Sequence, residues 1–405
     1  MPETLVIVGG GHAAGQAIAS LRQQKYRGRI VLLGEETHPP YQRPPLSKKF
    51  LAGELSAERL YVKPAAFYDA PDIDVRPGTR VTGIDRDRGA VTTEDGLTVA
   101  WDALLIATGS RVRRLPGDET LPAGIHYLRN IADVDAIRAD FAVAKRLVIV
   151  GAGYIGLEVA AVARTLGLDV TVLEMAGRVM SRVVSPAVSA FYESVHRAQG
   201  VDLRLNTGLA GFAGRPRVRA VVTAAGDEIP ADVVVVGVGI VPNVELAAAA
   251  GLEVDDGIVV DAGCRTSDPR IYAIGDCTSH PSAIYGRRVR LESVPNALEQ
   301  ARTAAGNLCG GRLEHAEVPW FWSDQYDLKL QIAGLSQGYD SVIVRGSPAD
   351  RAFSCLYLRD GRLLAIDAVN TPRDFMQAKA LIASRAHPDP ARAADAASPL
   401  KGLAG

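Results

Sequence analysis

The sequence contains the same short device twice: an apolar strand that runs into a glycine-rich turn and then into a helix. The first copy is LVIVGGGHAAG (residues 5–15), and the second is RLVIVGAGYIGLE (residues 146–158). A short continuous apolar run is typical of a parallel strand that is buried on both faces. The turn lets the main chain approach a pyrophosphate at the positive end of the helix dipole. Two copies therefore predict two α/β domains, each of which binds one dinucleotide.

The first turn supplies Gly9 and Gly11, with Ala14 in the third position, where a methyl group is commonly tolerated. An apolar strand at 30–33 follows and ends near Glu35, which can accept hydrogen bonds from a ribose. A glycine pattern alone also occurs in tight turns of purely structural importance. The preceding strand, the following helix and the acidic residue are the context that favours dinucleotide binding.

The second turn has the full GxGxxG spacing, with Gly151, Gly153 and Gly156. The next strand ends at Glu174, close to the expected distance of roughly 20 residues from the first glycine. A carboxylate at this position would repel a ribose 2′-phosphate, which favours NADH over NADPH. Arg178, four residues later, leaves NADPH open as the alternative.

Length and charge limit the possible classes of protein. At about 150 residues per domain, 405 residues allow roughly two or three domains. The net charge of −1 gives no global field that would attract nucleic acid or an anionic membrane. The start of the chain lacks the pattern of a signal peptide, and no apolar run approaches the roughly 20 residues of a membrane span. We expect a cytoplasmic protein that binds neither nucleic acid nor membrane.

The cysteines exclude one group of redox mechanisms. Cys264, Cys277, Cys309 and Cys355 are scattered and form neither CxxC nor CxxxxC. This spacing is inconsistent with a disulfide scaffold or a redox-active dithiol. We also predict no metal site.

Two further stretches, 102–110 and 232–243, each run an apolar strand into glycine, where the chain could cross between domains. The stretch 266–278 places Asp276 at the carboxyl end of a strand, where ligands of open parallel sheets bind. A structural role for Asp276, that of a helix N-cap, is the other interpretation, and the two roles are compatible.

The chain changes character from about Trp320. Alternating apolar runs there predict short antiparallel strands, and Asp360-Gly361 predicts a hairpin turn. A helix at 372–384 follows. The residues beyond Pro388 are expected to form a mobile tail.

With these motifs identified, the chain resembles the FAD-containing, NADH-dependent ferredoxin reductases of bacterial cytochrome monooxygenase and ring-hydroxylating oxygenase systems, in the glutathione reductase superfamily. The resemblance runs from residue 6 to about 383. It includes three segments that are not generic to flavoproteins with two dinucleotides: YQRPPLSKKFLAG (41–53), ESVPNALEQAR (292–302) and PWFWSDQYD (319–327).

The resemblance implies an α/β fold with two Rossmann-like dinucleotide-binding domains and a C-terminal α+β interface domain, with the FAD domain interrupted by the NAD domain. The implied boundaries are 1–110 and 243–319 for the FAD domain, 111–242 for the NAD domain and 320–405 for the interface domain.

The resemblance also assigns site residues. FAD contacts are implied for Gly9, Gly11, Ala13, Glu35, Lys48, Val81, Arg129, Asp276 and Val294, and NADH contacts for Gly151, Gly153, Tyr154, Ile155, Gly156 and Glu174. Lys48 and Glu158 are implied to be catalytic. A lysine near flavin N5 would stabilise negative charge on the reduced ring and would be held by the carboxylate. From the residues alone, the default interpretation of Lys48 is a solvated surface lysine. The default for Glu158 is an exposed polar residue, although its apolar neighbours in IGLEVAAVA favour an internal partner.

The implied reaction joins a two-electron donor to a one-electron acceptor. NADH gives two electrons as a hydride, a 2Fe-2S ferredoxin accepts one at a time, and FAD can do both. Such a transient partner is usually acidic, so we expect a basic docking patch. The candidates are Arg287, Arg288 and Arg290, with Arg43, Lys48 and Lys49 as others. Trp320 and Trp322 are candidates from the interface domain, although tryptophans are more often core residues. We expect a monomer or a weak dimer.

Two other classes share the glycine turns. Flavoprotein peroxidases and disulfide reductases need a reactive thiol beside the flavin, and PYQRPPLSKK (40–49) contains none. Relatives of apoptosis-inducing factor bind NADH for regulation and reduce acceptors slowly, whereas a ferredoxin reductase turns over many times per second.

Overall fold

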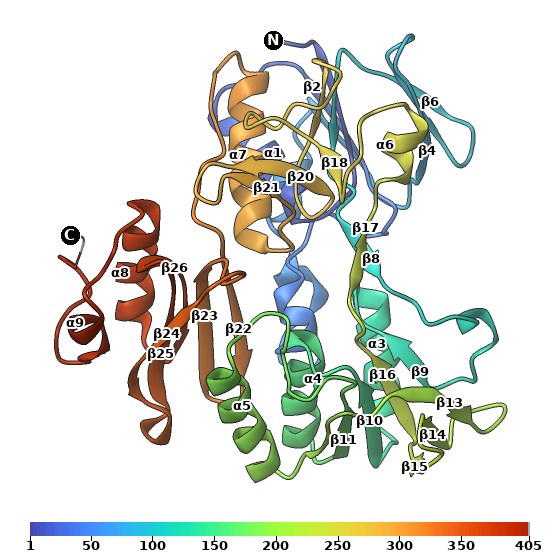
Figure 1. Ribbon diagram of the computed structural model, residues 1–405. Helices are drawn as coiled ribbons and strands as arrows, with labels where there is room; N and C mark the ends of the chain where they lie inside the picture. The colour runs from blue at the N-terminus through green and yellow to red at the C-terminus, as the bar shows by residue number, and fades with distance from the viewer. Residues whose placement is uncertain (404–405) are drawn as a thin grey trace. The chain divides into compact units, whose positions relative to one another are not determined.

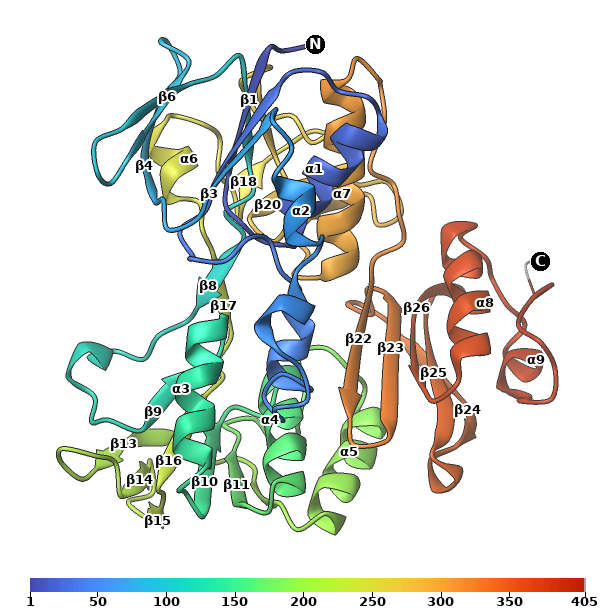
Figure 2. The ribbon, with the colours of Figure 1, turned by 180° about the vertical axis from the view of Figure 1, so that it is seen from behind.

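The computed structural model describes residues 1–403, which form two compact units (Figures 1 and 2). Unit 1 contains Met1–Arg43, Ala57–Arg111 and Val241–Pro319; unit 2 contains Pro44–Ser56, Val112–Ile240 and the chain from Trp320 onward. The chain passes between the units at β8 (Ser110–Val112) and β17 (Ile240–Pro242). Within residues 1–403, none of the helices has the length and apolar character required to cross a membrane.

A parallel five-stranded sheet forms the centre of unit 1. Its order is β19-β7-β1-β2-β3. The strands are β1 (Thr4–Val8), β2 (Arg29–Leu33), β3 (Ile73–Arg76), β7 (Ala103–Ile106) and β19 (Ile271–Ala273). Two helices, α1 (His12–Gln23) and α7 (Val294–Leu308), pack side by side on one face.

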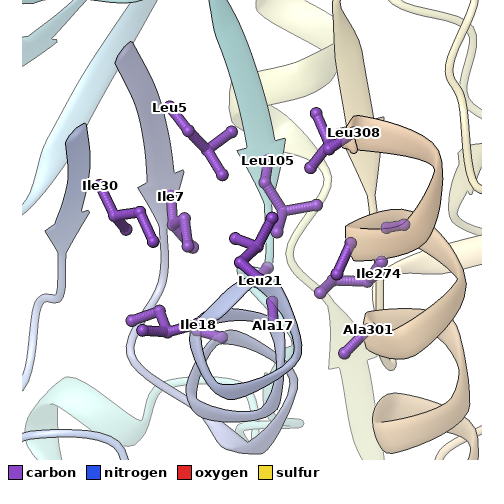
Figure 3. Close-up of a cluster of buried hydrophobic side chains, with 14 of the residues drawn as sticks. Leu5, Ile7, Ala17, Ile18, Leu21, Ile30, Leu105, Ile274, Ala301 and Leu308 are labelled. Carbon is purple, nitrogen blue, oxygen red and sulfur yellow. The ribbon is translucent and has the colours of Figure 1, made fainter. Parts of the chain in front are cut away.

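The strand β1 contributes to two cores, because successive side chains point to opposite faces of the sheet. Leu5 and Ile7 contact the cluster that includes α1 and α7 (Figure 3). Val6 and Val8 belong to a second cluster on the other face. Burying each of these side chains contributes roughly 1.5–3 kcal/mol. The continuous apolar run in the sequence is explained by this double burial.

Shorter elements complete unit 1. An antiparallel sheet joins β4 (Val81–Asp85), β5 (Ala90–Thr93) and β6 (Thr98–Ala100), and another sheet joins β18 (Ile258–Val259), β20 (Thr278–Ser282) and β21 (Arg287–Val289). The remaining helices are η2 (Ala57–Leu60), α2 (Ala65–Tyr68) and α6 (Glu245–Ala249).

Unit 2 contains a second parallel sheet, in the order β12-β11-β10-β16-β9. Its strands are β9 (Ile125–Tyr127), β10 (Arg146–Val150), β11 (Asp169–Leu173), β12 (Asp202–Arg204) and β16 (Val233–Val236). The sheet's helices are α3 (Ile131–Phe141), α4 (Tyr154–Thr165) and α5 (Pro186–Ala198), and an antiparallel sheet of β13 (Leu209–Ala213), β14 (Ala220–Thr223) and β15 (Glu228–Pro230) shares its core. Short helical turns occur at η1 (Pro44–Ser47) and η3 (Asp118–Thr120).

The last part of unit 2 is an antiparallel sheet in the order β22-β23-β26-β25-β24. The strands are β22 (Trp320–Gln325), β23 (Leu328–Gly334), β24 (Ser341–Ser347), β25 (Ala352–Arg359) and β26 (Arg362–Val369), with η4 (Pro348–Asp350) between β24 and β25. The helix α8 (Pro372–Ala383) packs on β23 and β26, and α4 packs against β22. Asp360 and Gly361 form the predicted hairpin turn, and both have positive φ.

The predicted fold class is confirmed. Both glycine turns join a central parallel strand to a helix, β1 to α1 and β10 to α4. The unit with the first turn is interrupted by the second turn's sheet, and an antiparallel sheet with a helix ends the chain.

The prediction of a mobile tail beyond Pro388 is wrong for residues 389–403; the rest of that prediction lies outside the described residues. The segment forms α9 (Pro390–Ala394), and Leu400 and Leu403 are buried. Arg345, which is itself buried, donates to the carbonyl oxygens of residues 393, 395, 396 and 398 and pairs with Asp374 at 2.8 Å. The alanine-rich composition of the segment gives no sign of this partner, because the contacts are made by its main chain.

Candidate functional site

The first glycine turn lies between β1 and α1. Gly9 has a φ of +107°, and a Cβ there would lie 2.3 Å from the carbonyl oxygen of Ala107, so a larger residue does not fit. Gly11 precedes α1, and a Cβ on it would meet nothing in the described part of the chain within 4 Å. Packing therefore does not require glycine at position 11. The open space lies beside the start of the helix, whose first N–H groups attract an anion.

Other predicted FAD contacts of unit 1 lie at the ends of its elements. Glu35 follows β2, and 73% of its side chain is exposed, with Arg80 Nε 3.8 Å away. Val81 begins β4, Val294 begins α7, and Ala13 is buried in the first turn of α1. The exposed carboxylate of Glu35 is accessible to a ribose.

Asp276 lies in the turn between β19 and β20. A Cβ on the neighbouring Gly275 would lie 3.4 Å from Ala13 and 3.9 Å from Ala297, so this turn approaches the first turns of both α1 and α7. The Asp276 carboxylate accepts a hydrogen bond from Ser110 Oγ at 2.8 Å. The alternative that Asp276 caps a helix is wrong, because the chain continues into β20. The turn thus brings Asp276 close to the predicted contacts on α1 and α7.

The sequence prediction missed the side chain that holds this turn in place. The buried amide of Gln300 accepts hydrogen bonds from the Gly275 N–H at 2.7 Å and from Thr278 Oγ1 at 3.0 Å. Gln300 lies in ESVPNALEQAR, one of the three segments of the resemblance. The available signal was a glutamine among the alanines of this segment, which the structure shows to be part of the helix α7.

The second glycine turn, between β10 and α4, repeats this geometry. Gly151 has a φ of +103°, and a Cβ there would lie 2.3 Å from the carbonyl oxygen of Gly237. A Cβ on Gly156 would lie 2.1 Å from the carbonyl oxygen of Gly151. A Cβ on Gly153, by contrast, would meet no atom of residues 1–403 within 4 Å. Packing therefore does not require glycine at position 153, which again lies at the start of a helix.

Glu174 is fixed beside this turn. One carboxylate oxygen accepts from the Ala152 N–H and the other from the Ala176 N–H, both at 2.8 Å. Arg178 lies nearby, but its guanidinium donates to Val184 O, Ser189 Oγ and Ser181 O at 2.6–2.7 Å. Arg178 is the residue that leaves NADPH open as an alternative in the sequence, and in the structure its guanidinium is already engaged in local hydrogen bonds.

Tyr154 and Ile155 form the start of α4. The Tyr154 ring lies 4.7 Å from the ring of Phe321 on β22, and its buried hydroxyl lacks a hydrogen-bond partner among residues 1–403. Burial raises the pKa of Tyr154 well above its ordinary value. Ile155 is 43% exposed. Of these two side chains, Ile155 is the one that a bound ligand can cover.

The two predicted catalytic residues form an ion pair within unit 2. Lys48 Nζ lies 2.7 Å from Glu158 Oε2, and Glu158 is only 2% exposed. Burial raises the pKa of Glu158, while the Lys48 ammonium and the hydroxyls of Ser323 and Ser47 act in the opposite direction. The alternatives of a solvated lysine and an exposed glutamate are both wrong.

Two serines that the sequence prediction missed complete this pair. Ser47 Oγ donates to Glu158 Oε2 at 2.5 Å, and Ser323 Oγ donates to Glu158 Oε1 at 2.6 Å. Ser47 directly precedes Lys48 in the chain. Ser323 shares an alternating face of the predicted strand with Phe321, so a polar residue at an inward position was the signal.

Arg129 lies in unit 2, one residue before Asn130, the N-cap of α3, and its N–H donates to Asp133 Oδ2 at 2.8 Å. The predicted FAD contacts thus fall in both units: Lys48 and Arg129 belong to unit 2, and the others belong to unit 1.

The predicted basic patch is only partly available. Arg287 and Arg288 are exposed, but the Arg288 guanidinium donates to the carbonyl oxygens of Val260 and Ser279. Arg290 forms ion pairs with Asp256 at 3.0 Å and with Glu292 at 2.5 Å. The two neighbouring carboxylates largely cancel the charge of Arg290.

The two tryptophans lie next to each other on β22. The ring centroids of Trp320 and Trp322 are 5.6 Å apart, and both side chains are half-buried. Trp320 also packs on Phe375 of α8, with Lys379 Nζ 5.8 Å from its ring. They are neither fully core residues nor fully exposed.

The four cysteines are free thiols. Cys264, Cys277 and Cys355 are buried, and burial raises the pKa of each thiol. These cysteines are poor candidates for nucleophiles or redox centres.

Comparison with known proteins agrees with this geometry. Residues 3–301 match the family described as Pyridine nucleotide-disulphide oxidoreductase, and residues 320–404 match the Reductase C-terminal domain. The chain is 47% identical to putidaredoxin reductase of Pseudomonas putida over 98% of this chain and 96% of the relative. It is 44% identical to the ferredoxin–NAD(+) reductase component of the anthranilate 1,2-dioxygenase system of Burkholderia cepacia, over 98% of each chain.

A solved structure, the crystal structure of the covalent putidaredoxin reductase–putidaredoxin complex, superimposes with a TM-score of 0.96 and 46% identity, covering 99% of this chain and 98% of the other. The chain therefore belongs to the pyridine nucleotide-disulphide oxidoreductase family and, within it, to the ferredoxin reductases similar to putidaredoxin reductase.

Proposed function

We propose that the protein transfers electrons from NADH, through FAD, one at a time to a 2Fe-2S ferredoxin that serves a cytochrome monooxygenase or a ring-hydroxylating oxygenase. The observation that carries this proposal is the presence in one chain of two glycine turns whose second glycines, Gly11 and Gly153, border open space. The relatives named as reductases of putidaredoxin and of an anthranilate dioxygenase system support the acceptor class.

FAD and NAD(H) are the cofactors of this family, and the open space at each turn fits a dinucleotide pyrophosphate. When bound, FAD supplies a ring that accepts two electrons together and releases them singly. We assign the pyrophosphate and ribose contacts to the first turn and its acidic neighbour, and the remaining contacts to the other residues predicted from the sequence. These residues are Gly9, Gly11, Ala13, Glu35, Val81, Asp276 and Val294 in unit 1, and Lys48 and Arg129 in unit 2.

The second turn is assigned to NADH, with contacts from Gly151, Gly153, Tyr154, Ile155, Gly156 and Glu174. The preference over NADPH is supported by Glu174, whose carboxylate is held by two N–H groups and cannot easily turn away from a 2′-phosphate. It is also supported by Arg178, whose donors are already engaged. NADPH would bring its phosphate against a fixed negative charge.

The role proposed for Lys48 is to stabilise negative charge on the reduced cofactor. A lysine side chain has four flexible bonds, so an ammonium that must act at one place needs an anchor. Glu158 supplies that anchor at 2.7 Å, and its burial keeps water from competing for the pair.

The proposed contacts for the ferredoxin are Arg287 and Arg288 in unit 1 and, separately, Trp320 and Trp322 in unit 2. Arg290 would contribute less than its formal charge because Asp256 and Glu292 neutralise it. We further propose a cytoplasmic monomer or weak dimer. The proposed domains are 1–110 with 243–319, 111–242 and 320–405; the match of the Reductase C-terminal domain from residue 320 supports the last boundary.

The test is a stopped-flow experiment with the purified, FAD-loaded protein. We expect NADH to bleach the flavin absorbance rapidly and NADPH to do so far more slowly, and a 2Fe-2S ferredoxin to be reduced many times per second. Rapid bleaching followed by slow ferredoxin reduction would instead place the chain with the regulatory NADH-binding flavoproteins.

A further inference from the structure

A chain of polar side chains runs from Glu158 along β22 to α5 in unit 2, and its members have no role in the function proposed above. Its members are Ser323 and Gln325 on β22, His196 on α5, and Tyr326 in the β22–β23 turn. The hydrogen bonds measure 2.6 Å from Ser323 to Glu158, 3.2 Å from Gln325 to Ser323, 2.9 Å between His196 and Gln325, and 3.3 Å between Tyr326 and His196. Ser323, Gln325 and His196 are each at most 1% exposed.

The direction of these hydrogen bonds is fixed by the ion pair at one end. Ser323 has a single hydroxyl proton, and it donates that proton to the Glu158 carboxylate. The serine oxygen can then only accept, so the Gln325 NH₂ group faces it and the Gln325 carbonyl faces His196. His196 must carry its proton on Nε2, which leaves Nδ1 to accept from the Tyr326 hydroxyl. Every bond in the chain therefore points its positive end toward Glu158.

His196 must be neutral for this arrangement to hold. Burial lowers the pKa of His196, although the hydrogen bond to Gln325 opposes that effect. The ring of Tyr326 lies 5.1 Å from the imidazole, and Tyr326 has a φ of +54°, a conformation that bulky residues rarely adopt. In this strained backbone conformation, the Tyr326 hydroxyl lies within hydrogen-bonding distance of His196 Nδ1.

Other ionisable groups face the ends of the chain. Lys48 lies against Glu158, and Tyr154 and Tyr192 are close enough to interact electrostatically with it. Arg164 interacts with Tyr326. Of these groups only Lys48 carries a charge near Glu158 at neutral pH, because burial raises the pKa values of both neighbouring tyrosines.

We propose that Gln325 and His196 are positioning residues: through Ser323 they hold the Glu158 carboxylate ionised and oriented, and Glu158 in turn fixes the Lys48 ammonium. A carboxylate in a buried site needs donors for both oxygens, and Oε1 receives its hydrogen bond from this chain. The Gln325 amide cannot pass a proton along without changing its tautomer, so the chain acts by polarisation and does not conduct protons.

The inference rests on the proposed role of Lys48, and its test separates the two. The variants are Gln325→Leu and His196→Leu, which break the chain, and Ser194→Ala, a matched control on α5 whose hydroxyl donates to Phe191 O outside the chain. Difference infrared spectroscopy follows the protonation of the Glu158 carboxyl, which is identified by its loss in Glu158→Gln. Single-turnover flavin reduction by NADH is measured across the same pH range.

We expect both chain-breaking variants to raise the apparent pKa of the Glu158 carboxyl by about one unit, and to slow flavin reduction roughly tenfold at neutral pH with the NADH dissociation constant unchanged. Gln325→Glu should recover much of the rate only at low pH, where its new carboxyl is protonated and can donate to Ser323. Ser194→Ala should match the wild type.

An unchanged carboxyl titration in both Gln325→Leu and His196→Leu would overturn the inference and leave the chain a purely structural feature. The variants could instead show the expected rise in the pKa of the Glu158 carboxyl while NADH fails to reduce the flavin even in the wild type. That result would refute the proposed function and leave the positioning of Glu158 intact.

Discussion

The two glycine turns share their backbone geometry and differ in how the acidic residue beside each is held. Gly9 and Gly151 have nearly equal φ angles, and a Cβ on either would lie 2.3 Å from a carbonyl oxygen. Glu35 is largely exposed, whereas Glu174 is held by two backbone N–H groups. The strand–turn–helix unit therefore dictates where a pyrophosphate can lie, while the surroundings of the carboxylate determine how strictly the ribose end is selected.

Buried carboxyl groups show a second contrast between the units. Asp268 in unit 1 is buried, yet its hydrogen bonds with Arg270 and Arg86 outweigh burial and lower its pKa. Asp367 in unit 2 accepts from the Tyr357 hydroxyl, and burial raises its pKa to about 7. Burial thus raises the pKa of Asp367, which has no arginine partner among the described residues, whereas the arginines beside Asp268 lower the pKa of that carboxyl; Asp374 of unit 2 resembles Asp268 in pairing with an arginine, Arg345.

The largest effect is expected from alanine at the first glycine of either turn. Gly9→Ala and Gly151→Ala each place a methyl group against a backbone carbonyl and impose a positive φ on alanine, at a cost of about 4 kcal/mol or more. Thermal unfolding and bound-flavin content measure the result. Ala14→Gly, which adds no atoms, is the control. Similar stability in either variant and the wild type would show that the backbone relaxes at that turn.

Asp367→Asn should change how stability depends on pH. Below about pH 4 the carboxyl is protonated in both the folded and the unfolded state. Between about pH 4 and 7 the unfolded state loses its proton first, so the wild type loses roughly 3–4 kcal/mol of unfolding free energy as pH rises, and then levels off. Asp367→Asn should lack this decline. Urea unfolding measures the free energy of unfolding of both proteins from pH 4 to 7. An equal change in that free energy over this range in the wild type and in Asp367→Asn would contradict the prediction.

Alanine at the second glycine of each turn should separate binding from folding. Because a Cβ at Gly11 or Gly153 would meet no neighbour among the described residues, both variants should fold with near-normal urea midpoints. The methyl group would, however, occupy the space proposed for a pyrophosphate, and we expect affinity to fall roughly 100-fold, for FAD in Gly11→Ala and for NADH in Gly153→Ala. Unchanged affinity would place the phosphates elsewhere.

The smallest effect is expected at the acidic residues. An amide at position 174 has a single oxygen, so it cannot accept from the Ala152 and Ala176 N–H groups on two different atoms as the carboxylate does. It also no longer repels a 2′-phosphate, so Glu174→Gln should reduce the preference for NADH over NADPH roughly tenfold. Glu35→Gln is the matched variant and should change FAD affinity by less than about threefold, since Glu35 is mostly exposed. Dissociation constants from fluorescence titration decide both. An equal effect at both positions would remove the contrast between the turns.

Features specified by neighbouring residues could be predicted from the sequence. The two strand–turn–helix units and the Asp360-Gly361 hairpin depend on glycine conformations and short apolar runs, both of which are visible in the chain. Asp276 shows the limit of such reasoning: its place at the end of a strand was predicted, but the helix-cap alternative failed because Gly275 turns the chain into another strand.

Features that depend on distant partners could not be predicted. Ser323 approaches Glu158 only because β22 packs on α4, and nothing near either residue in the sequence specifies that pairing. The sequence around Arg290 favours a basic patch, but Asp256, from another loop, lies 3.0 Å from its guanidinium. A charge or a hydroxyl has its effect through what surrounds it in space, and a single sequence does not contain that information.

The attachment of the C-terminal segment to Arg345 has a consequence for how such proteins can diverge. The guanidinium donates to backbone carbonyl oxygens at residues 393–398, and every amino acid has a backbone carbonyl. Substitutions in this stretch can therefore accumulate while its path stays the same. A single change at Arg345 would remove four of these main-chain hydrogen bonds at once, so part of the information that places these last residues is stored about fifty positions away from them.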